Sequence, residues 1–529
     1  FLYKSILIML SKVLASRQFS TSNPRAVAIM ANSRQGDLIG SKVMQKLRVV
    51  SGQDNLKFFG YGGQWMKKEG LDSTIDIDMN MFMDKTFVTY RKTKTVRESL
   101  YYRWNPLNFV NKHYTKNTDD IHELLMEADL PKKIHQGRPS LILNIDNEYM
   151  TFMLMDEIKK YYANSALDMP KRHYFNRFIK DFRQWTQKYV DYMHYTVPLV
   201  TGSSDGFYFP GRYIGQYGVY EATKHIYQSD PTLGKLVNEN SLFVNKRYFA
   251  TDMEKAIDNI RHSFRERNGI DQDATVIFFA PGNEANEAEF CCQNMRRGVK
   301  EFLLKYSAPT SLSPKAEPMK NFTTVISLHK GSEGEKYVRD FLKENEWTGN
   351  VVFVSNEENE HINAMAASDM AAIYDGQMIG SAAACHLPTM NLIKMRMHHQ
   401  WYNDLFNRYW NDLNIIADKN IYPELIGGEV WYGKIADTLA EWYVKPDVRY
   451  NMIKQWDGFL AEAMSYKEID RSVVRTRDHE LEDGQAYSEY EDPFFVAASA
   501  MWADIQKYEI NEGSHCQNHS SLRVKLPSF

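Results

Sequence analysis

Cysteine and long apolar runs are scarce in this chain. Its 529 residues include four cysteines, two of them adjacent at Cys291 and Cys292. So few cysteines do not form a disulfide framework, and a reducing compartment fits them better. No window of 18 or more apolar residues lacks charges, so the sequence predicts no membrane-spanning helix. A net charge of -3 favours neither nucleic-acid binding nor a strongly basic membrane-facing surface.

Acidic residues are missing from the N-terminal segment. The first is Asp37, whereas residues 1–36 carry five basic side chains. Residues 1–25 are apolar, basic and rich in hydroxyl groups, and "RQFSTS" is typical of the end of a mitochondrial presequence. The sequence therefore predicts a mitochondrial protein, in the matrix or on the matrix face of the inner membrane. Two alternatives are that the segment is retained as a docking arm, or that it is an ordinary strand or helix without acids.

Apolar runs alternate with amphipathic stretches after residue 25. "RAVAIMA" and "SLILNID" are examples early in the chain, and "ATVIFFAPG" and "FTTVISLH" are examples after a mixed stretch. Buried β-runs that alternate with helices indicate βαβ units on a parallel sheet. We therefore predict an α/β fold with two Rossmann-like domains, in which a ligand binds at the carboxyl ends of the strands.

The length and the changes in composition predict the domain limits. We place an N-terminal Rossmann-like domain at 26–250 and a C-terminal one at 251–450. Residues 92–138 and 159–191, which are basic and aromatic, are interpreted as insertions in the first domain. Residues 451–529 are interpreted as a helical, acidic extension with a polar tail.

The stretch "FFAPGNEANEAEF", residues 278–290, predicts a strand, a Pro-Gly turn and the start of a helix. Such a helix start offers free backbone N–H groups to a phosphate. Arg, Lys, Ser or Thr usually completes the cradle, but this turn carries Glu284, Glu287 and Glu289 and no cation. Glu284 and Glu287 can themselves cap the helix, so we expect the loop to bind no anion.

Seven segments between residues 26 and 430 resemble, in the same order, motifs of the lipid-A-disaccharide synthases. They include "ANSRQGDLIGSKVMQKL", "FFGYGGQWMKKEGLDS", "MHYTVPLV" and "FAPGNEANEAEF", the last being similar to Leu-Pro-Gly-Ser-Arg-x-x-Glu-Val. The resemblance implies a glycosyltransferase of the GT-B type with two Rossmann-like domains. It also implies transfer of a diacylglucosamine from a UDP donor to diacylglucosamine 1-phosphate, a lipid acceptor, without a metal or another cofactor.

The resemblance assigns three residues of the first domain. Gly36 and Asp37 match the Gly-Asp of the family's first turn and are interpreted as remnants of the donor-binding site. Asp146 matches an Asp at a strand end, which the family pattern suggests as the general base for the acceptor hydroxyl. An Asp after an apolar strand is also a common helix cap, so both interpretations of Asp146 stay open.

The donor side departs from the family pattern. Gly282, Gly376 and Asn414 are kept, as remnants of the donor site. Glu284 replaces the Arg expected to meet the UDP diphosphate, and Ser381 replaces the Glu that holds the donor ribose. At ~5 Å and an effective dielectric near 20, each unit charge pair is worth roughly 3 kcal/mol. Replacing attraction by repulsion therefore changes the affinity for diphosphate by a factor of about 10⁴.

We therefore expect a catalytically degenerate relative of this family. It would be a structural or accessory subunit, with other protein subunits as partners, in a mitochondrial inner-membrane assembly such as a respiratory complex or ATP synthase. The alternatives are a working glycosyltransferase with a rearranged donor site, and a lipid-handling protein that retains the acceptor side. No nucleic-acid partner is expected, because the net charge is -3. No metal is expected either: His515, Cys516 and His519 have metal-like spacing, but they lie in a polar tail.

Overall fold

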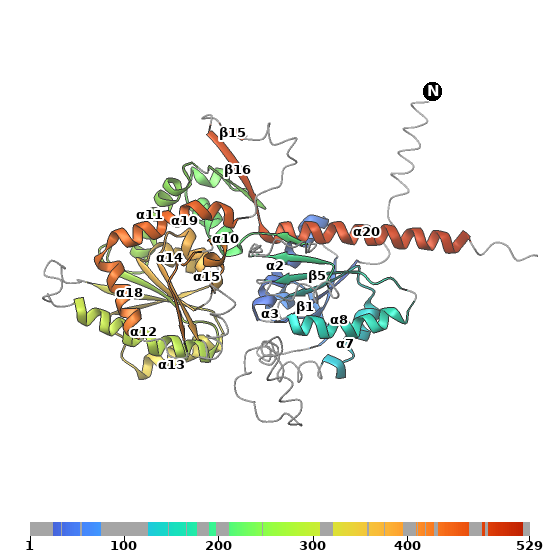
Figure 1. Cartoon of the computed structure of the whole chain (residues 1–529), viewed down its shortest axis with the longest axis horizontal. Helices are drawn as coiled ribbons and strands as arrows, with labels where there is room; N and C mark the ends of the chain where they lie inside the picture. The colour runs from blue at the N-terminus through green and yellow to red at the C-terminus, as the bar shows by residue number, and fades with distance from the viewer. Residues whose placement is uncertain are drawn as a thin grey trace, which may run out of the picture. The chain divides into compact units, whose positions relative to one another are not determined.

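The chain forms two compact units, shown in Figure 1. The first comprises Phe1–Tyr195, Asp205–Arg212 and Phe494–Phe529, and the second comprises Thr196–Ser204 and Tyr213–Pro493. The computed structural model describes residues 25–32, 34–52, 56–75, 125–145, 148–165, 167–176, 190–196, 211–245, 247–306, 321–356, 359–374, 376–394, 409, 411–417, 419–427, 432–464, 479–481 and 485–521.

The first unit is built on a seven-stranded sheet with the order β3-β2-β1-β4-β5-β6-β7. The pairs from β3 through to β6 are parallel. Five of the six residues of β1 and all five of β4 are buried, as expected for parallel strands covered on both faces. The strands are β1 (Ala26–Ala31), β2 (Lys57–Tyr61), β3 (Leu71–Ser73), β4 (Leu141–Ile145), β5 (Lys171–Asn176), β6 (Tyr192–Tyr195) and β7 (Gly211–Tyr213).

Helices cover both faces of this sheet. In Figure 1, α7 and α8 run along one face, and α20 runs along the other. Leu130 and Ile134 of α7 and Leu154 of α8 pack with Ala28 and Ile142 of the sheet in one buried cluster. The helices of this unit are α2 (Arg34–Ser51), α3 (Gln64–Lys68), α7 (Leu130–Gly137), α8 (Glu148–Ala163) and α20 (Pro493–Ser521).

The second unit is built on a six-stranded parallel sheet with the order β11-β10-β9-β12-β13-β14. All seven residues of β10 are buried, including its two threonines and its serine. The strands are β9 (Thr275–Ala280), β10 (Phe322–Leu328), β11 (Asn350–Ser355), β12 (Met370–Ile373), β13 (Thr389–Lys394) and β14 (Glu424–Gly427). The prediction of two Rossmann-like α/β domains is therefore confirmed.

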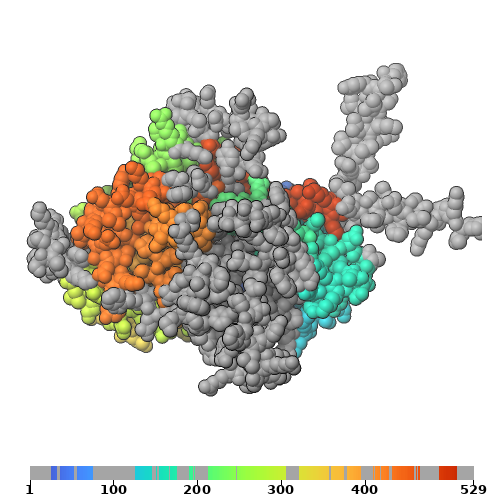
Figure 2. Space-filling view, in the orientation of Figure 1, coloured from blue at the N-terminus to red at the C-terminus, as the bar shows by residue number. Residues whose placement is uncertain are grey.

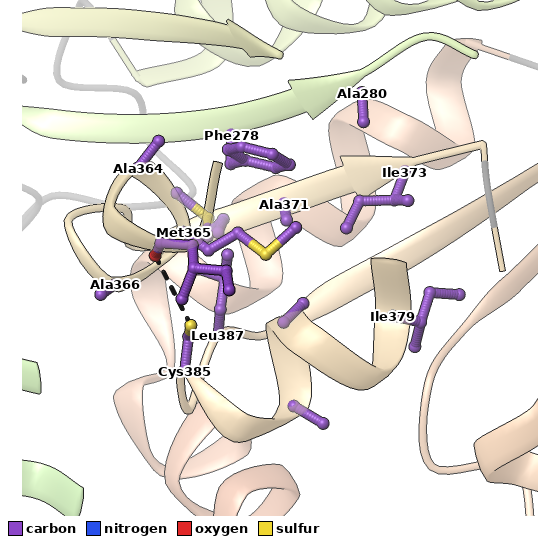
Figure 3. Close-up of a cluster of buried hydrophobic side chains, with 14 of the residues drawn as sticks. Phe278, Ala280, Ala364, Met365, Ala366, Ala371, Ile373, Ile379, Cys385 and Leu387 are labelled. Atoms are coloured by element: carbon purple, nitrogen blue, oxygen red, sulfur yellow. Dashed lines mark hydrogen bonds between the residues drawn. The ribbon is translucent and has the colours of Figure 1, made fainter. Parts of the chain in front are cut away.

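The helices of the second unit pack closely because many of their buried residues are small. Figure 3 shows Ala364 and Met365 of α14 and Ile379 of α15 against Phe278 and Ala371 of the sheet. The helices are α10 (Tyr217–Ser229), α11 (Phe249–Arg267), α12 (Ala285–Tyr306), α13 (Glu333–Glu344), α14 (Glu360–Ala366), α15 (Gly376–Ala384), α17 (Asp412–Ala417), α18 (Tyr432–Val444), α19 (Pro446–Ala463) and the 3-10 helix η3 (Leu233–Leu236). The outer surface of α18 and α19 is orange in Figure 2.

A small antiparallel sheet corrects the expectation of a purely helical C-terminal extension. It has the order β15-β16-β8, with β8 at Ser241–Val244, β15 at His479–Leu481 and β16 at Gln485–Glu491. The acidic stretch that contains β16 therefore forms a strand. Its tyrosines favour a strand, and β8 supplies the backbone partner, with Tyr490 opposite Leu242.

The packing also divides the chain differently from the predicted domain limits. Residues 213–250, expected in the first domain, belong to the second unit, and most of α20 belongs to the first. The expected insertion at 159–191 contributes β5, which lies between β4 and β6. Of the insertion at 92–138, the structure describes residues 125–138, and the presequence-like residues 1–24 lie outside the described part. Within the described ranges, no helix is both long and apolar enough to span a membrane.

Candidate functional site

The turn between β9 and α12 has the predicted geometry of an anion-binding loop. Gly282 has φ of 101°, a left-handed conformation that favours glycine. A Cβ atom there would lie 2.6 Å from Oε2 of Glu287, so a side chain at this position would also collide with the start of α12. The turn is held from the side of α13, because the Gly334 N–H donates to the Asn283 carbonyl at 2.9 Å.

A carboxylate of the protein already accepts hydrogen bonds from the backbone N–H groups of this turn. Oε2 of Glu287 accepts hydrogen bonds from the N–H groups of Asn283 at 3.0 Å and Glu284 at 3.2 Å. This is the helix cap expected from the sequence. Glu287 corresponds to the Glu of the family's Pro-Gly-Ser-Arg-x-x-Glu motif, so the cap itself follows the pattern. The departure lies at Glu284, which is half-buried where the pattern has Arg.

Lys394, at the end of β13, is a cation near this turn that the sequence analysis did not select. Its Nζ lies 3.4 Å from the carbonyl oxygen of Asn286 and 5.8 Å from the centre of the Phe290 ring. Burial raises the pKa of the Cys291 thiol, and of the two neighbouring charges Glu287 raises it further while Lys394 lowers it. The position of Lys394 at the carboxyl end of a parallel strand was the signal available in the sequence.

Ser381 is used for helix packing. It is buried on α15, and its hydroxyl donates to the Gly218 carbonyl of α10 at 3.1 Å. A Cβ on the neighbouring Gly380 would lie 3.2 Å from the Val219 backbone nitrogen. The two helices therefore approach closely because these residues are small. A glutamate at position 381 would have to displace α10.

Asn414 is fully buried, and both ends of its amide bind the protein. Nδ2 donates to the Tyr422 carbonyl at 2.8 Å and to Oε1 of Glu424 at 3.0 Å. Oδ1 accepts from the N–H groups of Ile421 and Tyr422 at 2.9 and 3.0 Å. Asn414 therefore fixes the chain between α17 and β14. Both the NH₂ group and the oxygen of its side-chain amide are hydrogen-bonded to other residues of the protein.

We expect replacement of Asn414 by alanine to destabilise the second unit by about 2–4 kcal/mol. The change leaves several buried backbone and side-chain groups without partners, and each costs about 1–3 kcal/mol with partial relaxation. Urea denaturation with hydrogen exchange on peptides from β14 measures the loss. Alanine at the exposed Asn350 is the control and should change stability by less than about 0.5 kcal/mol. Equal effects of the two substitutions would contradict the structural role.

Gly36 and Asp37 lie buried in α2 of the first unit. Oδ1 of Asp37 accepts from the N–H groups of Gly63 at 2.8 Å and Met66 at 3.0 Å, and Oδ2 accepts from Trp65 at 3.1 Å. Burial raises the pKa of Asp37, while these three N–H groups oppose the rise. Asp37 therefore ties α2 to the start of α3.

The structure leaves other predicted residues partly or wholly undescribed. Asp146 lies outside the described residues, so neither of its two roles is tested. Gly376 is the first residue of α15. His515, Cys516 and His519 fall within α20, but their side chains are not described. Elsewhere in the described part of the chain, no three His, Cys, Asp or Glu side chains are grouped so as to hold a metal ion.

Comparison with known proteins agrees with the resemblance of the motifs. The chain is 22% identical over 445 residues to a lipid-A-disaccharide synthase of Hydrogenovibrio crunogenus, covering 82% of this chain and 96% of that protein. The chain is thus a distant homologue of that synthase. No protein-family model matches it.

Two solved structures are similar to this chain over most of its length. UDP-GlcNAc 2-epimerase from Neisseria meningitidis has a TM-score of 0.43 and 12% identity, over 83% of this chain and 98% of the epimerase. A trehalose 6-phosphate synthase from Burkholderia multivorans has a TM-score of 0.43 and 8% identity, over 93% of this chain and 100% of the synthase.

Proposed function

We propose that this protein is a glycosyltransferase-like protein that no longer binds a sugar nucleotide and serves as a structural subunit of a mitochondrial inner-membrane assembly. The observation that carries the loss of donor binding is the turn before α12. Glu284 is half-buried there, where the family pattern has arginine, whereas the cap by Glu287 follows that pattern. A diphosphate entering this turn would meet carboxylates and would lack the guanidinium that neutralises a leaving UDP group.

Two further residues of the second unit support this proposal. Ser381 is bound to α10, and Asn414 is bound to the backbone near β14. Ser381 stands where the family pattern has the Glu that holds the donor ribose, Asn414 matches the pattern, and both serve packing in this structure. A protein that keeps the fold and uses these two side chains for packing fits selection for a structural role rather than for glycosyl transfer.

The location and the partner rest on the sequence. Residues 1–25 resemble a mitochondrial presequence, and the basic and aromatic stretch at 92–138 is suited to contact with other proteins. These features support a subunit role without identifying the assembly.

We expect titration of the full chain with UDP or UDP-sugars to show no saturable binding below about 100 µM. The reason is the repulsion between diphosphate and the carboxylates of the turn, which costs roughly 3 kcal/mol for each charge pair at ~5 Å and an effective dielectric near 20. Isothermal titration calorimetry measures it, with the Hydrogenovibrio crunogenus synthase as the matched control. Binding tighter than about 100 µM would overturn the proposed loss of donor binding.

The structural role is tested separately by native fractionation of mitochondrial membranes. We propose that the protein elutes in a large particle together with other subunits. Elution as a free monomer would contradict the subunit role and would leave the result on donor binding unaffected.

A working glycosyltransferase is the second candidate, and Lys394 is the observation in its favour. Its ammonium lies at the first turn of α12, where it can offset part of the negative charge of the turn. If UDP binds, a Lys394→Gln variant should weaken that binding at least tenfold, whereas Lys343→Gln on the exposed part of α13 should not change it.

A further inference from the structure

Two buried histidines and a partly buried aspartate form a chain of contacts in the first unit. Nδ1 of His173 on β5 lies 3.0 Å from Nε2 of His194 on β6, and Nε2 of His173 lies 3.2 Å from Oδ2 of Asp504 on α20. Both histidines are fully buried. The chain of contacts joins two adjacent strands to a helix that lies 331 residues further along the sequence than His173.

The aspartate fixes the tautomers of both rings. A carboxylate only accepts, so Nε2 of His173 carries a hydrogen and Nδ1 is a lone-pair acceptor. Nε2 of His194 must then donate to that acceptor. Nδ1 of His194 is left as a buried acceptor, and the described residues give it no hydrogen-bond partner. Both contacts are therefore satisfied when the two rings are neutral.

The surroundings disfavour a proton on either ring. Burial lowers the pKa of His173, although Asp504 and the nearby Asp191 oppose this and Lys171 adds to it. Burial lowers the pKa of His194 well below its usual value, and the charges of His173 and Arg212 lower it further, against Asp504.

The two carboxylates are themselves paired with basic residues. Asp191 is held by Arg172 through contacts of 2.7 and 2.9 Å, and Oδ1 of Asp504 lies 3.3 Å from Nζ of Lys507. The hydrogen bond from His173 lowers the pKa of Asp504. Asp504 therefore stays ionised over the range in which histidines titrate.

We propose that α20 is a protonation-sensitive strap, which the neutral His173–His194 pair holds on the first sheet through Asp504 and which is released as the pH falls. In the released state both rings face water and regain the ordinary pKa of about 6.5. Protons then bind the released state more strongly than the docked state. The docked state is fully favoured above pH 6.5 and loses stability below it.

Release of α20 would expose an apolar face. Phe494, Val496, Met501 and Ile505 are buried on the described part of the helix. Other contacts of α20 do not depend on histidine: Arg25 lies 4.6 Å from the Trp502 ring centre, and the Tyr508 hydroxyl donates to the Asp168 carbonyl at 2.9 Å. Acid therefore weakens the docking through the histidines, whereas these contacts favour the docked state equally at both pH values.

The expected effect follows from the two titrations. Between pH 7.5 and 5.5, protonation of one histidine in the released state raises the opening equilibrium about tenfold. Two histidines raise it up to about a hundredfold. Hydrogen exchange of peptides from residues 494–508 of the full-length protein, corrected for the intrinsic effect of pH, measures this change. Peptides from α11, which belongs to the second unit, serve as the internal reference.

Two variants separate the histidine titration from simple packing. His194→Gln should reduce the acid effect to about tenfold or less, because one titrating group is lost. Asp504→Asn should lower the protection of α20 at both pH values but keep the dependence on pH, because both histidines remain. His262→Gln, on the exposed side of α11, is the matched control and should behave as the wild type.

Two results would refute the proposal, and the first needs only the unmodified protein. Equal corrected protection of α20 at pH 7.5 and 5.5 would overturn it, and so would an undiminished acid effect in a folded His194→Gln variant. A hundredfold loss of protection that falls to about tenfold in His194→Gln is the supporting result.

Discussion

Replacing Asp369 by alanine should lower the stability of the second unit by about 3–5 kcal/mol, because it leaves a buried guanidinium without its counter-charge. Oδ2 of Asp369 accepts from Nη2 of Arg265 at 3.1 Å and from the Val276 N–H at 2.9 Å. Oδ1 binds Arg261. Arg265 is fully buried, and burial lowers its pKa.

The remaining donors of Arg265 bind backbone carbonyls. Nε donates to Ala367 at 2.9 Å, and Nη1 donates to Gln272 at 2.7 Å and Ala274 at 3.0 Å. The guanidinium thus joins the end of α11, the start of β9 and the end of α14. In the Asp369→Ala variant the carbonyls still hold the guanidinium in place, so its charge cannot move to water without breaking these bonds.

Hydrogen exchange of β9 and β12 peptides in increasing urea measures this loss for the second unit by itself. A two-unit chain need not unfold in one step, so a probe within the unit is required. Arg267→Ala is the matched control. Its contact with Glu360, at 3.4 Å, lies at the surface of the same helix, and its loss should cost less than about 1 kcal/mol. A similarly small effect of Asp369→Ala would contradict the assignment.

The strands with a continuous or predominantly apolar sequence were predictable, because a strand that is buried on both faces consists mostly of apolar residues. β1 is continuously apolar, and β4 and β10 are predominantly apolar. β5 was not predicted, because "KRHYFN" is basic and polar. It pairs with β4 on one side and β6 on the other, and three successive residues, His173, Tyr174 and Phe175, are buried.

Contacts between segments that are far apart in the chain could not be predicted from the sequence. β16 pairs with β8, and Asp504 meets His173, although composition alone marked the C-terminal region as helical and acidic. The turn before α12 was predictable in more detail, because a strand, a Pro-Gly pair and a helix start follow one another directly. The cap by Glu287 was confirmed, while Lys394 reaches the turn from a strand 108 residues away, so its place at the carboxyl end of that strand did not by itself indicate this turn.

The second large effect is a gain of UDP affinity when Glu284 is replaced by arginine. The substitution reverses one charge beside the turn, so repulsion of roughly one unit pair becomes attraction. At ~5 Å this swing is worth about 1.7 kcal/mol in a water-like medium and about 6 kcal/mol at an effective dielectric of 20. UDP should therefore bind between about fifteenfold and ten-thousandfold more tightly than to the unmodified protein.

The control for this gain is Glu289→Arg, which changes the charge equally on an exposed position of α12 five residues further on. Calorimetric titration with UDP compares the two variants at equal ionic strength, because surface charges are screened by salt. A gain in Glu284→Arg well above that in Glu289→Arg would locate the lost affinity in this one side chain. Equal gains would mean that the net charge of α12 governs binding. No gain in either would mean that the Glu287 cap and the packing of Ser381 close the site by shape, and the electrostatic explanation would then be wrong.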